Sequence, residues 1–305
     1  MSAILTFDVV VVGAGVAGLQ ATLTLARARR RVLLLDGGPQ RHAVSSHMHN
    51  MIGADGMERT AFFDAAHATI AQYEEAYHVA GEAVSVVPTE DAFVLTLASG
   101  EEVMCAAVLL TTGLHDVLPD VAGMQALWGT RVLHCAYCHG YEVGGRAIGL
   151  YAKPAYVFDL LEANLNLSPN ITVFFDDEAT DARVVEQVEA LGVRVVTAPI
   201  LQLAQTAEGL AALLSDGTSC EVAALFVKPV QVQRSTLPQA MGCAINERGF
   251  IATDWWGRTS VPWVYAAGDA AGAYAQLASS VAAGLHAAVI INADFNALRI
   301  RQVRA

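Results

Sequence analysis

Residues 7–18 read FDVVVVGAGVAG, and this stretch decides the fold of the chain. The short, β-branched run at residues 7–12 predicts a strand that is buried on both faces, as in a parallel sheet. Gly13 permits a sharp turn after that strand. Gly15 lets the backbone approach a phosphate group, and Gly18 lets a helix pack closely on the strand. The stretch therefore predicts a strand, a glycine-rich turn and the start of a helix.

The residues that follow complete a nucleotide-binding unit. Residues 19–30 predict the helix, and residues 31–35 predict a second strand that ends at Asp36. In such a unit the helix N-terminus binds phosphates, and an acid after the second strand binds a ribose hydroxyl. We expect Asp36 to be that acid, with Ala14 and Gly37 at the same site. The motif alone does not separate NAD from FAD.

The composition suits one large or two smaller α/β domains. The chain has 305 residues, of which 54% are hydrophobic, so it can bury a sizeable core. A formal net charge of −12 disfavours nucleic acid as a partner, because phosphates need clustered Lys and Arg. The start of the chain lacks the basic region of a signal peptide, so we expect a cytoplasmic protein. The most apolar segment, residues 279–298, predicts a core helix and no membrane span, because four polar residues interrupt it: His286, Asn292, Asp294 and Asn296.

Two later segments indicate FAD. Residues 106–113 (AAVLLTTG) and residues 263–269 (WVYAAGD) each predict a buried strand that ends in a turn. They resemble the two secondary FAD motifs of flavoproteins with two dinucleotide-binding domains. The resemblance implies that Asp269 binds the ribityl or phosphate region, and that a helix N-terminus stabilises charge on the reduced flavin. The other residues it assigns to FAD are Thr112, Gly113, Gly268, Gln276, Leu277 and Ala278.

The chain has five cysteines, and two of them form a Cys-x-x-Cys motif, Cys135 and Cys138. The remaining three are isolated, which predicts buried packing thiols. The pair has four interpretations. Half a zinc site needs a second ligand pair that the sequence does not offer, so we predict no metal site. A structural disulfide gains little at this spacing, and a c-type haem would need export. A redox-active dithiol beside the flavin is favoured, because the motif lowers a thiol pKa.

Taken together, the motifs resemble the low-molecular-weight thioredoxin reductase family of FAD-dependent pyridine nucleotide–disulfide oxidoreductases, over essentially the whole chain. The resemblance implies an α/β fold with two Rossmann-like, three-layer domains, the second inserted in the first. The FAD domain is expected at residues 1–117 plus 247–305, and the middle domain with the Cys-x-x-Cys motif at residues 118–246. The resemblance also implies that Cys138 lies next to the flavin C4a, that Cys135 meets the external substrate, and that the protein is a homodimer.

One residue departs from ordinary members of that family. They carry Asp after the second cysteine, whereas this chain carries His139. The run Cys-His-Gly-Tyr-Glu resembles a subgroup that includes the gliotoxin-type dithiol oxidases. Residues 40–47 resemble the same subgroup, in which this segment lines the FAD, and this implies contacts from Arg41 and His47. A histidine beside the nucleophile suits a general acid/base better than a packing role, because its pKa lies near neutrality.

The middle domain lacks the signature of an NADPH site. Residues 146–151 predict a strand and residues 155–164 a helix. The sequence GLYAKP at residues 149–154, where the phosphate-binding turn is expected, keeps only Gly149 of the glycine set. After the next strand, NADPH enzymes place arginines, whereas this chain has Asp176, Asp177 and Glu178, which would repel a 2′-phosphate. Charge alone does not exclude NADH, but the lost glycines argue against it too. We therefore expect FAD without NADPH.

Three functions remain. The first is a thioredoxin-reductase-like enzyme that moves two electrons between FAD and Cys135/Cys138 and on to a thioredoxin-like protein, with a donor such as ferredoxin or another flavin. The second is a dithiol oxidase that forms a disulfide in a small dithiol with O₂ as the acceptor. The third, a non-catalytic redox-sensing binder, is disfavoured by the intact Cys135, Cys138 and His139.

Overall fold

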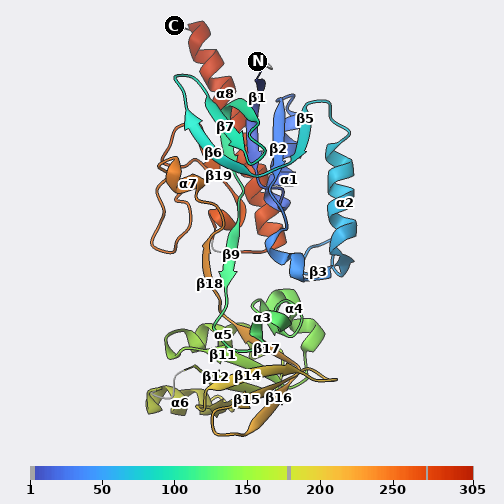
Figure 1. Cartoon of the computed structure of the whole chain (residues 1–305), viewed down its shortest axis with the longest axis vertical. Coiled ribbons are helices and arrows are strands. Elements are labelled where there is room, and N and C mark those ends of the chain that lie inside the picture. The colour runs from blue at the N-terminus through green and yellow to red at the C-terminus, as the bar shows by residue number, and fades with distance from the viewer. Residues whose placement is uncertain (1–3, 177–179, 273, 305) are drawn as a thin grey trace. The chain divides into compact units, whose positions relative to one another are not determined.

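The computed structural model describes residues 4–176, 180–272 and 274–304. The chain divides into two compact units, each of α/β type (Figure 1). The first unit comprises Met1–Ala43, Glu58–His115 and Gln231–Ala305, and the second comprises Val44–Met57 and Asp116–Val230. The second unit is thus inserted into the chain of the first.

The first unit is built on a seven-stranded sheet with the order β5-β2-β1-β8-β7-β6, and β19 also pairs with β8. The strands β5, β2, β1, β8 and β19 are parallel, while β6 and β7 form an antiparallel extension. This is the buried parallel sheet that the run of β-branched residues predicts. The strand bounds are β1 Leu5–Val12, β2 Val32–Asp36, β5 Ala76–Ala80, β6 Ala83–Pro88, β7 Phe93–Leu97, β8 Glu102–Leu110 and β19 Val264–Ala266.

Small residues allow two helices of the first unit to pack closely. A methyl group on Gly284 of α8 would overlap the carbonyl oxygen of Ala17 in α1, and one on Gly268 would lie 2.9 Å from the Ala17 side chain. The two helices therefore meet backbone to backbone, beside the glycine-rich turn after β1. The helices of this unit are α1 Val16–Arg27, α2 Arg59–Ile70, α7 Leu237–Ala240 and α8 Leu277–Arg304, with short 3-10 turns η1 Arg41–Val44 and η3 Gly268–Ala270.

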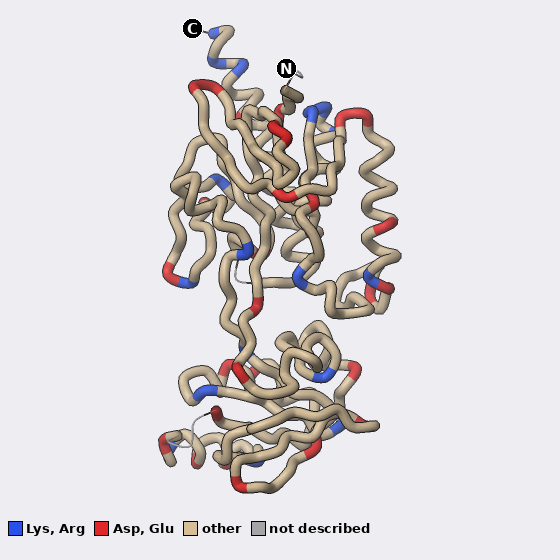
Figure 2. Tube along the Cα trace, in the orientation of Figure 1, with Lys and Arg blue, Asp and Glu red and all other residues tan. Residues whose placement is uncertain are grey.

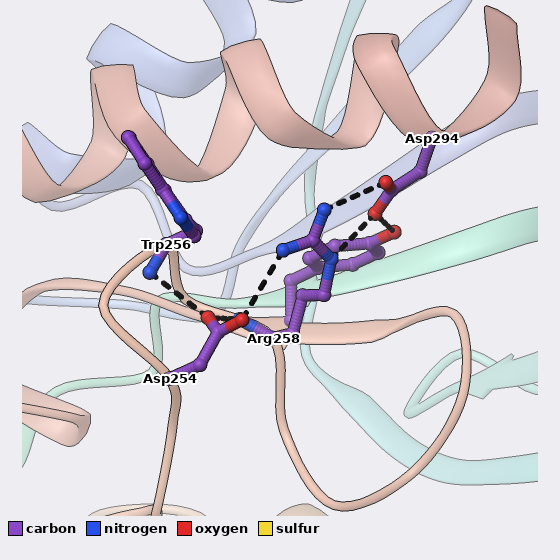
Figure 3. Close-up of polar contacts among 5 residues, drawn as sticks. Asp254, Trp256, Arg258 and Asp294 are labelled. Atoms are coloured by element: carbon purple, nitrogen blue, oxygen red, sulfur yellow. Dashed lines mark hydrogen bonds and ion pairs between the residues drawn. The ribbon is translucent and has the colours of Figure 1, made fainter. Parts of the chain in front are cut away.

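The long helix α8 is only partly buried. It is long and apolar enough to cross a membrane by length and composition, but only 22% of its most apolar window is buried. The expectation of a core helix is therefore wrong in extent, because one face packs on α1 and another is exposed. Polar contacts also join α8 to the rest of the first unit. Arg258 donates to both carboxylate oxygens of Asp294, at 2.8 and 2.7 Å, and Tyr265 donates to the same carboxylate at 2.8 Å (Figure 3).

The loop before β19 is organised by the same arginine. Asp254 accepts hydrogen bonds from the backbone N–H groups of Trp256 and Arg258, both at 2.9 Å, and from the Arg258 guanidinium at 3.1 Å (Figure 3). Arg258 thus joins this loop to α8. At the far end of α8, basic positions gather in the last turns (Figure 2), where Arg301 and Arg304 interact favourably with the helix dipole.

The second unit has three layers. Side chains of β11 alternate between two cores: Ile148 and Leu150 pack with the helices, whereas Tyr151 packs toward an antiparallel sheet. A five-stranded parallel sheet, ordered β10-β17-β11-β12-β13, therefore lies between helices and the three-stranded sheet β14-β15-β16. Its strands are β10 Val132–Leu133, β17 Ala224–Val227, β11 Ile148–Ala152, β12 Ile171–Phe175, β13 Arg194–Val196, β14 Ile200–Gln205, β15 Leu210–Leu214 and β16 Ser219–Val222.

Short elements complete this unit and the connections. The helices are α3 Met124–Leu127, α4 Ala136–Val143, α5 Val157–Asn164 and α6 Ala182–Glu189, with the 3-10 turn η2 Pro154–Tyr156. Two small ribbons pair β3 with β4 and β9 with β18. Their bounds are β3 His47–Met48, β4 Met57–Glu58, β9 Leu114–Val117 and β18 Val230–Gln233.

The division between the units differs from the expected boundaries of 117 and 246. The chain returns to the first unit at Gln231, because Leu237 and Cys243 are buried in the core of the first unit. The segment Val44–Met57, expected in the FAD domain, groups with the second unit. This second difference brings residues near position 45 to the cysteine pair.

Candidate active site

The cysteine pair opens a helix of the second unit. Cys135 and Cys138 form a disulfide, and Cys135 is the N-cap of α4. The backbone N–H groups of Cys138 and His139 both donate to the carbonyl oxygen of Cys135, at 3.2 and 3.3 Å. The first turn of a short helix thus fixes the pair. When the disulfide is reduced, the helix N-terminus stabilises a thiolate there.

His139 is held by a serine from a distant part of the chain. Its Nε2 atom lies 2.7 Å from Ser45 Oγ, and its Nδ1 atom is buried without a hydrogen-bond partner among the described residues. Burial lowers the pKa of His139 below its ordinary value of 6.5, and His49 lowers it further, while Glu142 opposes the shift. The imidazole is therefore neutral at pH 7, so one ring nitrogen can accept a proton.

A second polar pair flanks this contact. His49 Nδ1 lies 3.4 Å from Glu142 Oε1 and 3.8 Å from Asp55 Oδ1. Glu142 follows His139 by three positions on α4, so both side chains lie on one face of that helix. The segment 44–57 thus supplies Ser45 and His49 to α4. Neither residue was predicted as part of the site: Ser45 lies in the segment 40–47 that was expected to line the FAD, and His49 had no local signal.

The other three cysteines are buried, which confirms their expected role as packing thiols: Cys105, Cys220 and Cys243. Burial raises the pKa of the Cys105 thiol to about 12, and it also raises the pKa of Cys243. At neutral pH both side chains are thiols rather than nucleophilic thiolates. Of the five cysteines, only Cys135 and Cys138 lie in a disulfide.

The glycine-rich turn of the first unit has the geometry of a phosphate cradle. Gly13 has φ +113°, and a methyl group on Gly18 would overlap the Gly13 carbonyl oxygen, so both positions require glycine. Among the described residues, and apart from its chain neighbours and its own helix backbone, no heavy atom lies within 4 Å of the position that a methyl group on Gly15 would take. Gly15 also caps α1, whose first turn contains no acidic residue. An open backbone at a helix N-terminus suits a pyrophosphate.

A carboxylate and two orphaned polar atoms lie in the same unit. Asp269 accepts from Arg41 at 3.1 Å and from Ser280 Oγ at 3.1 Å. Thr112 Oγ1 and His42 Nε2 are buried without hydrogen-bond partners among the described residues. Burial lowers the pKa of His42 to about 4, so this ring is neutral. Because buried polar atoms rarely stay unpaired, these two atoms fit a bound ligand with polar groups, as FAD has.

Most of the residues that the sequence predicts for FAD belong to the first unit of the structure, and their contact with FAD stays a prediction. They are Gly13, Ala14, Gly15, Gly18, Asp36, Gly37, Arg41, Thr112, Gly113, Gly268, Asp269, Gln276, Leu277 and Ala278. Gln276 directly precedes α8, which begins at Leu277. His47 instead lies in the second unit, where it is exposed on β3 and its Nδ1 lies 2.9 Å from Ser46 Oγ. Its contact with the flavin stays a prediction. His42 was missed, although it follows Arg41 directly.

The equivalent turn in the second unit is different. Gly149 lies inside β11, where a methyl group would come within 2.7 Å of Leu225 and 3.0 Å of Phe174. This residue serves strand packing, so its interpretation as a remnant of a phosphate-binding turn is wrong. The strand ends only at Ala152, and the turn that follows contains Pro154, which has no N–H group to donate.

Acidic side chains surround the start of the next helix. Asp159 lies in the first turn of α5 and pairs with Lys228 at 2.9 Å. Asp176, after β12, pairs with Lys153 at 3.6 Å. Lys153 and Lys228 are therefore each paired with a carboxylate, and the two acids would repel a pyrophosphate. Asp177 and Glu178, also expected to repel a 2′-phosphate, lie outside the described residues.

Comparison with known proteins gives matches over nearly the whole chain. The family model described as pyridine nucleotide-disulphide oxidoreductase matches residues 7–153 and 159–284. The chain is 30% identical over 306 residues to thioredoxin reductase sirT of Leptosphaeria maculans, covering 94% of this chain and 93% of that protein. A crystal structure of HlmI has a TM-score of 0.90 at 34% identity, covering 98% of this chain and 95% of that one. An oxidoreductase from Agrobacterium tumefaciens has a TM-score of 0.89 at 31% identity, covering 95% and 99%.

Proposed function

We propose that this chain works without NADPH, although it belongs to the thioredoxin reductases of the pyridine nucleotide–disulphide oxidoreductase family and is thus an FAD-dependent disulfide oxidoreductase. The observation that carries this proposal is the turn after β11. It contains Pro154 where a phosphate-binding turn would offer glycine, and Asp159 and Asp176 lie on either side in sequence. The second unit keeps the three-layer fold and supports the cysteines, but its loop does not suit a dinucleotide.

We propose dithiol oxidation as the reaction. A reductase needs an electron donor, and the loop that would bind NADPH is altered. An oxidase needs only a dithiol, the cysteine pair, FAD and O₂. When bound, FAD supplies a two-electron acceptor that passes electrons on to O₂, giving peroxide. The dithiol loses two electrons and two protons and becomes a disulfide.

The protein's side chains carry out the thiol exchange. A substrate thiol transfers its proton to the neutral imidazole of His139, and the thiolate attacks Cys135. The Cys135–Cys138 bond breaks, and Cys138 leaves as a thiolate at the N-terminus of α4. The second substrate thiol then gives its proton to the Cys135 sulfur as it attacks the substrate sulfur of the mixed disulfide, which releases Cys135 as a thiol. The substrate leaves as a disulfide, and the cysteine pair carries the two electrons.

The second candidate is electron transfer to a thioredoxin-like protein from a donor other than NADPH. It is favoured by the name of the relative sirT, a thioredoxin reductase, and by two aromatic side chains on α4. Tyr137 is 70% exposed and Tyr141 is 92% exposed, beside the cysteine pair. Exposed tyrosines at a reactive disulfide suit a protein partner, since tyrosine is enriched at interfaces.

We also propose a homodimer through the first unit. The exposed side of α8 carries Leu285, Val289, Ile300 and Val303, and the nearby Trp255 is 81% exposed. An apolar helix face of this kind is typical of an interface between subunits. Light scattering on the FAD-loaded protein should give twice the mass of the chain, and Val289→Arg should shift it toward the monomer.

Anaerobic stopped-flow measurement on the FAD-loaded protein tests the function. The visible absorbance of the flavin should fall rapidly with dithiothreitol and stay unchanged with NADPH. Turnover in air should release one peroxide per disulfide formed. Rapid bleaching by NADPH would refute the proposal for the second unit. Reduction of a thioredoxin-like protein by photoreduced enzyme, without oxidation of small dithiols, would favour the second candidate.

Two variants give the matched controls. Cys138→Ser should abolish reduction of the flavin by dithiol, because the pair can no longer form its disulfide. Cys220→Ser removes a thiol that is buried elsewhere and should react like the wild type. If Cys138→Ser bleaches at the wild-type rate, Cys138 does not deliver electrons to the flavin.

A further inference from the structure

Three side chains that are far apart in sequence converge beside the nucleotide site of the first unit. Asp36 ends β2, His67 lies in the last turn of α2, and His78 lies in β5. In the parallel pairing of β2 and β5, Leu34 lies opposite His78, so Asp36 and His78 share one face of the sheet as diagonal neighbours. One ligand atom of each of the three residues lies within 4.8 Å of the others.

The three side chains lie near one another at distances somewhat longer than those between two ligands of one ion. His78 Nε2 lies 4.0 Å from Asp36 Oδ2, which is too long for a hydrogen bond. The rings of His67 and His78 stack with centroids 4.7 Å apart. Metal–ligand bonds of about 2.0–2.2 Å place two ligands of a tetrahedral ion roughly 3.4 Å apart. Metal binding therefore requires the exposed His78 side chain to turn out of its stack on His67 and move closer to Asp36.

The carboxylate is already oriented for this purpose. The backbone N–H of Gly38 donates to Asp36 Oδ1 at 3.2 Å, and Asp36 Oδ2 is the oxygen that faces His78. Two imidazoles and one carboxylate suit zinc and its first-row neighbours, whereas magnesium and calcium prefer oxygen ligands alone. His78 is exposed, so water can complete the coordination sphere and the ion can exchange.

We propose that Asp36, His67 and His78 form an exchangeable site for a divalent metal ion of the zinc type. The site shares Asp36 with the FAD site, because the same carboxylate is the expected acceptor for a ribose hydroxyl of FAD. This consequence rests on the proposed role of Asp36. Metal and FAD therefore compete, and each weakens the binding of the other by the same factor.

Titration of the FAD-loaded protein with Zn²⁺ tests the site. The Cys135–Cys138 disulfide is kept oxidised, so that its thiolates cannot bind the metal. Calorimetry should show one Zn²⁺ per chain, and Co²⁺ in its place should give the visible absorption of a site with nitrogen ligands. His67→Ala and His78→Ala should each weaken Zn²⁺ binding by at least about tenfold. His115→Ala changes an exposed histidine elsewhere and should leave it unchanged.

The same samples report the coupling to FAD. Zn²⁺ should raise the FAD dissociation constant, measured as free flavin after ultrafiltration, and this effect should vanish in both histidine variants. The proposal is overturned if Zn²⁺ binding does not saturate, or if it survives His67→Ala and His78→Ala. If Zn²⁺ binds through the histidines and the affinity for FAD stays constant, the shared carboxylate is refuted. The flavin reduction by dithiol remains a separate result in each case.

Discussion

Replacing His139 with Gln keeps a side chain that can reach Ser45 but removes the nitrogen that takes up a proton. If His139 is the base for the incoming thiol, reduction of the flavin by dithiol at pH 7.5 should slow by about 10²- to 10⁴-fold. The fold should persist, because Gln can replace the 2.7 Å contact between His139 Nε2 and Ser45 Oγ.

The pH profile gives the more specific signature. Burial lowers the pKa of His139 below 6.5, so the ring is a neutral base at pH 7.5 and becomes protonated only at more acidic pH. The wild-type rate should therefore be constant around pH 7.5 and should fall at a midpoint below pH 6.5. In His139→Gln this acidic limb should be absent, because the titrating group is gone.

Ser45 should have a smaller and graded effect. Its hydroxyl makes one hydrogen bond to the imidazole, and such a bond contributes about 0.5–1.5 kcal/mol net. Ser45→Ala should therefore slow the reaction by about 2- to 13-fold if the whole bond acts in the transition state. Ser46→Ala is the matched control, because Ser46 bonds to the exposed His47 instead.

Single-turnover reduction with dithiothreitol under anaerobic conditions, repeated from pH 5.5 to 8.5, measures all three variants. A role for His139 as the base is refuted if His139→Gln reacts within about threefold of the wild type. It is also refuted if the variant keeps the acidic limb. If Ser45→Ala and Ser46→Ala have equal rates, Ser45 does not position the imidazole.

Three further results are expected. The pKa of about 4 for His42 means that, as the pH falls below 6.5, the unfolded chain binds a proton before the folded chain does. The free energy of unfolding, measured with urea, should therefore fall by an amount on the order of 3 kcal/mol between pH 6.5 and 4. This loss should be absent in His42→Gln. Gly15→Ala should keep the thermal stability of the FAD-free protein, since its methyl group meets no heavy atom of the described residues beyond its chain neighbours and its own helix backbone within 4 Å. It should weaken FAD binding by roughly tenfold or more, because the methyl group would meet the bound phosphate. An unchanged affinity would contradict the phosphate cradle. Arg258→Met should lower the free energy of unfolding in urea by about 1–3 kcal/mol, because it leaves Asp294 without its charged donor. Arg248→Met, on an exposed loop, should be neutral. Equal effects of the two variants would argue against a stabilising role for the contacts of Arg258.

The nucleotide-binding turn of the first unit was predictable because its signals are local. The β-branched run and the glycines fix β1 and the start of the next helix within a few residues of each other. The helix bounds differ most: α1 begins at Val16, inside the glycine motif, and ends at Arg27, before Arg29 adopts φ +61°. The glycine motif forms the sharp turn after β1 and also the first turn of helix α1. Residue preferences for helices do not predict a helix that begins in such a motif.

The second unit shows where such reasoning fails. Gly149 looked like the remnant of a phosphate-binding turn, although it lies inside the strand predicted over residues 146–151. The structure extends β11 to Ala152, and the packing of Leu225 and Phe174 against Gly149 explains the residue instead. Strand length depends on pairing with β12 and β17, which is set by tertiary contacts.

Contacts between residues far apart in the chain could not be predicted from the sequence either. Ser45 reaches His139, and His67 stacks on His78, because separate elements fold against one another. No spacing rule links such positions in a single sequence. The motif around Cys135 identified the chemistry, but the residues that support it come from the segment 44–57.

The packing of α8 on α1 has a consequence for biosynthesis. Most of the second unit is one continuous stretch of chain, so it can fold as soon as that stretch has left the ribosome. The first unit must wait, because β19 pairs with β8 and Gly284 of α8 packs against Ala17 near the start of the chain. Until α8 has been made, the apolar faces of α1 and β8 remain exposed and are substrates for chaperones. The domain inserted in the middle is thus the one that can form first.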